Sequence, residues 1–165
     1  MGMIATLLRV SDQQLEHYRA DSRALEDRIY AEDAEPDPCT LNLDKTWDGI
    51  IYLLTGASAQ HATGALRQVL FSGQLVDATQ DFGYGPAHFL RRPQVAYFHE
   101  QLSRISTEDL RRRFDPGEMT RAEVYPMIWE EGTPALDYLL GAFVRLRDFY
   151  SLAAAHGQAV VSFVS

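Results

Sequence analysis

The chain has 165 residues, 46% of them hydrophobic, and its 23 acidic and 15 basic residues give a formal net charge of -8. This length suits one domain with a hydrophobic core, and we expect a single domain over residues 1–165. The acidic balance argues against nucleic acid or an anionic membrane as a partner, because contacts to phosphate need a basic surface. Cys39 is the only cysteine, so no internal disulfide forms.

No targeting or membrane-spanning segment is predicted. Residues 2–10 are mostly apolar and have no charged leader, which indicates a buried strand rather than a signal peptide. No apolar run approaches the roughly 18 residues of a spanning helix. We therefore expect a soluble cytoplasmic protein that binds no membrane.

The first helix is predicted from about residue 12 to residue 30. Ser11 and Gln14 form a capping box in front of it, and apolar residues recur along one of its sides. The acidic, proline-containing residues 31–40 are expected to form a surface loop.

The next helix is predicted over residues 44–55. Asp44 suits its N-cap, and Gly56 suits the left-handed residue that follows its last turn. One side is apolar at the spacing of a helix that packs on a core. The residues on that side are Trp47, Ile50, Ile51 and Leu54.

The second half of the chain alternates short elements with one long helix. Thr63 is expected to cap a short helix over residues 65–71, and residues 74–76 and 87–90 are candidate strands. Further helices are predicted to open near Pro93, Ser106 and Thr133, and Asp115 opens either a turn or a helix. The helix that opens at Thr133 has apolar residues at helical spacing on its inner face and ends at Gly157, and a strand over residues 158–164 closes the chain.

The fold class follows from this order of elements. Helices dominate, and the few strands include both ends of the chain. The two terminal strands are apolar at nearly every residue, which predicts interior positions in a small sheet. We therefore predict an α+β (mixed α/β) fold, a helix-rich domain whose small sheet includes the N- and C-terminal strands.

The start of the second helix carries the first candidate site. Lys45, Trp47 and Asp48 lie within about one turn of one another, and such a cluster is typical of a pocket rim with an aromatic wall. The alternative is structural: an N-cap, a surface ion pair and a core tryptophan. The position of Trp47 on the apolar side favours that alternative.

A glycine-rich turn is the second candidate site. Its residues are Gly83, Tyr84 and Gly85, in the sequence Asp-Phe-Gly-Tyr-Gly-Pro. The kinase magnesium triplet and the dinucleotide fingerprint are both rejected, because their required neighbours are missing. We expect positive φ at both glycines. The turn either presents Tyr84 and free backbone amides to a ligand or only leads into a strand.

Two further segments carry polar and aromatic residues. His61 lies in a small, polar loop, either as a site residue or as a solvent-facing histidine. The histidines lack metal-binding spacing, and no cofactor motif is present, so we expect no metal and no cofactor. In residues 123–131, Tyr125 and Trp129 either line a groove for a partner or fill the core.

Several landmarks along the chain form one combination that is more specific than its parts. They are Met1-Gly-Met-Ile4, Leu43-Asp-Lys-Thr-Trp-Asp48, Leu53-Leu-Thr-Gly56, Gly83-Tyr-Gly-Pro-Ala87, Val124-Tyr-Pro126, Trp129 and the final helix and strand. In order and spacing the chain resembles the YfbM-like family of bacterial proteins of unknown function. The resemblance implies a compact α/β fold in a bacterial cytoplasmic protein, and it supplies no reaction, cofactor or catalytic residue.

Two functional hypotheses follow. The first is a small binding or interaction protein without catalysis, whose partner is a protein or a small molecule and which neutralises a basic partner protein in one version. The second is an enzyme of unrecognised type that uses a pocket near Lys45, Asp48, His61 and Tyr84. An enzyme requires these four side chains to converge in one pocket with a perturbed pKa.

Overall fold

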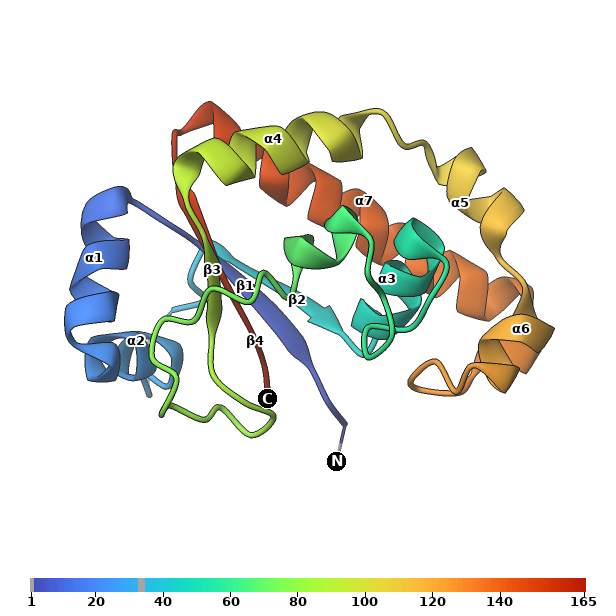
Figure 1. Ribbon diagram of the computed structural model, residues 1–165, viewed down its shortest axis with the longest axis horizontal. Coiled ribbons are helices and arrows are strands. Elements are labelled where there is room, and N and C mark those ends of the chain that lie inside the picture. Colours follow the sequence, from blue (N-terminus) through green and yellow to red (C-terminus); the bar gives the residue numbers. More distant parts are fainter. Residues whose placement is uncertain (1, 33–34) are drawn as a thin grey trace.

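The computed structural model describes residues 2–32 and 35–165 and shows one sheet covered by helices (Figure 1). Four strands pair antiparallel in the order β2-β1-β4-β3. Their bounds are β1 Ala5–Val10, β2 Thr40–Asp44, β3 His88–Leu90 and β4 Ala159–Val164. The predicted α+β class is confirmed.

The two ends of the chain supply the two central strands, as predicted. β1 pairs with β4 along its whole length, from Ala5 opposite Val164 to Val10 opposite Ala159. Every residue of β4 is buried, which explains its almost uninterrupted apolar sequence. Both chain ends therefore lie at the same end of the sheet (Figure 1).

Helices cover the two faces of the sheet and create two cores. The bounds are α1 Asp12–Ala20, α2 Ser22–Ile29, α3 Trp47–Thr55, α4 Arg92–Ser103, α5 Thr107–Arg113, α6 Pro116–Arg121 and α7 Thr133–Ala155, with short 3₁₀ helices η1 Ala65–Val69 and η2 Trp129–Glu131. Alternate residues of β1 face opposite sides, so Leu7 joins the core under α3, α4 and α7, whereas Leu8 joins the core under α1 and α2. None of these helices, within the described residues, is long and apolar enough to cross a membrane.

The first predicted helix is two helices in the structure. Asp21 is extended between them, its N–H donates to the carbonyl of His17, and its side chain accepts a hydrogen bond from the amide of Arg23. The break was missed because the apolar spacing continues across it, while Asp21 caps the second helix locally. The Ser11–Gln14 capping box is confirmed.

The predicted start of the helix at Asp44 is wrong. Thr40–Asp44 is strand β2, and Leu41 pairs with Leu7 of β1. Asp44 has a left-handed φ of 51° and its amide donates to the side chain of Asn42, so the helix begins only at Trp47. Pairing with β1 decides this segment, because Leu41 and Leu43 alternate with a polar Asn42 as strand residues do.

The rest of that helix matches the prediction. Trp47, Ile50, Ile51 and Leu54 are buried, and Gly56 ends the helix with φ 84°. The cap predicted at Thr63 is wrong, because η1 begins after Gly64 and has no side-chain cap. The strand predicted over residues 74–76 is reduced to a single bridge between Leu75 and His88.

The C-terminal elements follow the local signals closely. Pro93 lies in the first turn of α4, Ser106 caps α5, and Asp115 caps α6. The inner face predicted for α7 is buried throughout. Met1 and residues 33–34 of the predicted surface loop lie outside the described residues.

Candidate functional site

Four segments that are far apart in the sequence meet around one pocket of about 320 Å³. They are the residues just before β1, the start of α3, the loop after α3 and the loop between α6 and η2. The lining residues used below are Met3, Trp47, Asp48, Ser58, His61, Glu123, Tyr125 and Met127. The volume is at the lower end of the range for small-molecule sites, about 300–1,000 Å³.

Asp48 connects the start of α3 to the loop after α3 and to the loop between α6 and η2. It lies in the first turn of α3 and is only 6% exposed. One carboxylate oxygen accepts a hydrogen bond from the amide of Ala59 at 2.6 Å, and the other accepts one from the amide of Tyr125 at 2.9 Å. The side chain thus fixes the positions of both loops relative to the helix.

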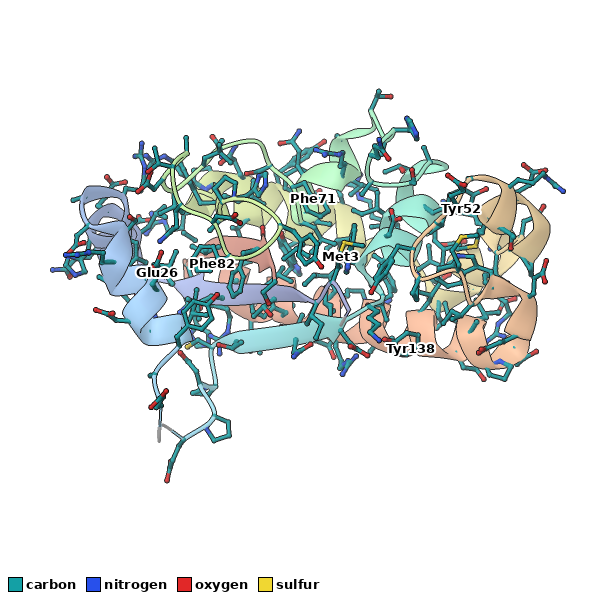
Figure 2. The ribbon with its side chains drawn as sticks, turned by 90° about the horizontal axis from the view of Figure 1, so that it is seen from below. Met3, Glu26, Tyr52, Phe71, Phe82 and Tyr138 are labelled. Atoms are coloured by element: carbon teal, nitrogen blue, oxygen red, sulfur yellow. The ribbon has the colours of Figure 1, made fainter. Side chains whose placement is uncertain are left out.

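The two aromatic rings of the pocket hold the N-terminal segment in place. Trp47 and Tyr125 are stacked, with ring centroids 5.6 Å apart and planes at 27°. The indole N–H of Trp47 donates to the carbonyl of Met3, and the amide of Met3 donates to the Tyr125 hydroxyl, both at 2.9 Å. Met3 is labelled near the middle of Figure 2. A network of hydrogen bonds therefore links the walls of the pocket.

Burial dominates the electrostatics of Asp48. Loss of water around the carboxyl raises its pKa above the ordinary value of 3.8, and the two amide hydrogen bonds only partly oppose this effect. A buried carboxyl with a raised pKa in a pocket is a feature shared by functional sites and by some structural networks.

The loop that carries Tyr125 is held in an unusual backbone conformation. Glu123 and Met127 are not glycines but have φ of 54° and 70°. The loop is anchored below by Trp129, which is fully buried and donates its indole N–H to the carbonyl of Val124 at 2.7 Å. Of the two aromatic residues predicted for this segment, Tyr125 lines the pocket and Trp129 fills the core.

Lys45 does not line this pocket. Its amide donates to the hydroxyl of Tyr138, which in turn donates to the carboxylate of Asp44. Tyr138, labelled in Figure 2, lies on α7 beside the end of β2. The Lys45 side chain runs along Gly2, where an added Cβ would lie 2.2 Å from its Cε.

Tyr84 also lies elsewhere, in a turn beside the C-terminus. Gly83 and Gly85 have the predicted positive φ, 122° and 105°, and a Cβ added at Gly83 would lie 3.6 Å from the Cα of Ser165. The predicted free amides are not free, because one oxygen of Asp81 accepts hydrogen bonds from both glycine amides at 2.8 and 3.0 Å. Tyr84 itself is 56% exposed.

The pocket brings together the residue types of a hydrolytic triad but not their connections. Ser58, His61 and Asp48 all line it. Within the described residues, no side-chain hydrogen bond joins Ser58 to His61 or His61 to Asp48; Ser58 and His61 are joined only by their backbones, where the His61 N–H donates to the Ser58 carbonyl at 3.0 Å. Both oxygens of Asp48 are occupied by backbone amides. A nucleophile needs a hydrogen-bonded base that a third group orients, and this arrangement is missing here.

A larger groove of about 870 Å³ lies on the other face of the sheet. Two of its charged residues, Arg28 and Asp37, form a 2.9 Å ion pair with each other and so neutralise one another. Ala31 and Glu35 line the groove, and residues 33–34 between them lie outside the described part of the chain. We therefore take the smaller pocket around Asp48 as the candidate site, although the groove has the larger volume.

Sequence reasoning named four of the eleven residues that line this pocket and missed the rest. It named Trp47, Asp48, His61 and Tyr125, but not the contributions of Met3 and the loop residues on either side of Tyr125. Nothing in the local sequence marks those residues, because only the tertiary fold brings them to α3. In the described residues no group of three metal-ligating side chains comes together.

The fold and the pocket define a small α+β protein in which a four-stranded antiparallel sheet has its terminal strands at the centre. A family model described as a domain of unknown function, DUF1877, matches residues 1–163, so the chain belongs to that family. A crystal structure of YfbM from Escherichia coli, a protein of unknown function, has the same fold. Its TM-score is 0.77 at 16% identity, over 98% of this chain and 99% of that chain. The resemblance predicted from the landmarks is confirmed, and no curated protein matches the sequence.

Proposed function

We propose that the protein is a cytoplasmic binding protein without catalysis, and that the pocket around Asp48 receives its ligand or a side chain of its partner. One observation carries this proposal: four separate segments are hydrogen-bonded around a preformed pocket, while the buried carboxyl group of Asp48 is engaged by backbone amides rather than by a catalytic base. Preformed pockets with a few fixed polar groups are typical of ligand sites.

In one version of this proposal the partner is a basic protein that the chain neutralises. The net charge of -8 supports this version, because opposite charges steer partners together. Such a complex weakens as salt rises, since exposed charges are screened over about 8–10 Å at physiological ionic strength. A complex with unchanged affinity between low and high salt would contradict the electrostatic part of the proposal.

The test is a thermal-shift screen against metabolites, nucleotides and basic polypeptides, followed by two histidine variants. A ligand at 100 times its dissociation constant stabilises the folded state by about 2.7 kcal/mol, which raises the melting temperature by several degrees. His61→Ala should reduce that shift, whereas His17→Ala, which alters an exposed histidine on α1, should not. Equal shifts in both variants would place the binding site outside this pocket.

An enzyme is the second candidate, favoured by the raised pKa of Asp48 and by His61 on the same pocket. It is less well supported because Lys45 and Tyr84, the other two residues of that hypothesis, do not line the pocket. An enzyme would turn over a ligand found in the screen, and His61→Ala would abolish that turnover. A ligand that binds and is recovered unchanged favours the binding protein.

A further inference from the structure

The lining of the pocket around Asp48 combines negative charge with aromatic rings. Asp48 and Glu123 supply carboxylates, and Trp47 and Tyr125 supply ring surface. Among its lining residues, within the described part of the chain, there is neither lysine nor arginine. Carboxylates and aromatic faces are the two groups with which proteins attract organic cations.

The charge of Asp48 has no counter-charge beside it. The residue is 6% exposed and takes part in none of the ion pairs formed by residues 2–32 and 35–165. A buried carboxylate is normally paired with a cation, because an isolated buried charge is costly. The two amides that bond to Asp48 bring dipoles but no net charge. The wall of the pocket therefore holds a carboxyl group with no lysine or arginine beside it in the described part of the chain.

The basic side chain of Arg67 contacts the loop after α3, but its hydrogen bonds go to backbone carbonyls. Its Nε donates to the carbonyl of Ala59 at 2.8 Å, and its Nη1 donates to the carbonyl of Phe71 at 3.2 Å. Its guanidinium group also lies 5.3 Å from the centre of the Phe71 ring. These contacts direct its donors to backbone carbonyls and not to the carboxyl group of Asp48.

We propose that the pocket binds a monovalent organic cation, an ammonium or guanidinium group on a short alkyl chain. This inference rests on the proposed binding function and adds the chemical class of the ligand. The volume of about 320 Å³ suits a small amine or one basic side chain rather than a large ligand. A free amine and a lysine or arginine side chain of a partner protein share this chemistry.

The test uses four probes of similar size: butylammonium, butylguanidinium, 1-butanol and butyrate, at constant ionic strength. Binding is followed by the indole N–H signals of the two tryptophans of the chain. Trp47 lines the pocket and should shift, whereas Trp129 lies in the core and serves as an internal control. We expect the two cations to bind at least about tenfold more tightly than 1-butanol or butyrate.

A pair of exposed variants tests the charge without disturbing the core. Glu123→Gln removes a carboxylate from the pocket lining and should weaken cation binding about two- to fivefold, as expected for an exposed pair. Glu130→Gln removes an exposed carboxylate that does not line the pocket and should leave the affinity unchanged.

The outcomes separate this inference from the function on which it rests. If 1-butanol or butyrate shifts Trp47 as strongly as the cations do, the pocket binds ligands but the cation inference is wrong. If no probe shifts Trp47, and the thermal-shift screen also finds no ligand, both are wrong. Tighter binding of an amide-capped lysine or arginine than of the butyl cations would identify a partner's side chain as the source, and weaker binding would identify a free amine.

Discussion

The sharpest prediction concerns Asp48, whose removal leaves two backbone amides without an acceptor. In Asp48→Ala the N–H groups of Ala59 and Tyr125 lose their partner inside the protein. The hydrogen bond from Ala59 is buried, whereas that from Tyr125 is part-buried. A buried unsatisfied donor costs about 1–3 kcal/mol, so the free energy of unfolding should fall by at least about that amount. Asp48→Asn keeps one acceptor oxygen and should lose about half as much.

Asp81→Ala is the matched control. Asp81 also accepts two backbone amide hydrogen bonds, from Gly83 and Gly85, but it lies on the surface, where water replaces the lost acceptor. Urea denaturation followed by tryptophan fluorescence measures all the variants. The reasoning would be refuted if Asp48→Ala lowered the free energy of unfolding no more than Asp81→Ala does. Burial of the two amides would then add nothing to the cost of losing their acceptor.

The same carboxyl predicts a pH dependence of stability with a defined sign. Because the pKa of Asp48 is raised in the folded protein, folding disfavours its charged form. Its contribution to stability is therefore greatest below the ordinary pKa of 3.8 and declines as pH rises toward the raised folded value. The stability difference between the parent protein and Asp48→Asn should shrink over that window, and a difference that grows would mean that the two amides outweigh burial.

Two further predictions concern packing and a surface network. Gly49→Ala should destabilise the protein, because the new Cβ would lie 2.7 Å from Trp129 and overpacking of about 1–3 kcal/mol outweighs a helix-propensity gain of about 1 kcal/mol. In Gly141→Ala the new Cβ meets nothing within 4 Å, so this variant should be more stable than the parent protein by about 0.5–1 kcal/mol. Equal melting temperatures for the two variants would contradict this prediction. Tyr138→Phe should lower the free energy of unfolding by about 0.5–1.5 kcal/mol, because the hydrogen bond to Asp44 is lost. Burial and this hydrogen bond raise the pKa of Tyr138 to about 12, so the substitution should remove one late-titrating tyrosine from an alkaline absorbance titration. A titration curve unchanged by the substitution would contradict this assignment.

Local signals predicted the elements whose burial or caps are written in neighbouring residues. The Ser11 and Ser106 caps each act within one turn, so their sequence pattern is sufficient. The two terminal strands are apolar on both faces, which only an interior position in a sheet explains. The buried face of α7 could also be predicted, because its apolar residues recur at the spacing of one side of a helix.

Strand β2 shows where local signals fail. The segment that contains Leu41 and Leu43 has enough apolar residues for either a helix or a strand, and the helical pattern after it extended the prediction backwards. Pairing with β1 decides the matter, since the backbone groups of an edge strand need partners that the segment cannot supply for itself.

The sequence by itself determined the α+β class, the central position of both chain ends, and a set of polar and aromatic residues from which a site is built. Only the tertiary structure decided which of them meet. The hydrogen-bond partners of Asp48 are 11 and 77 residues away along the chain, and Trp129 is directed into the core while Tyr125 faces the pocket. Periodicity and caps report contacts within a few residues, whereas a pocket depends on how separate segments pack, and that packing is fixed only when the whole core forms.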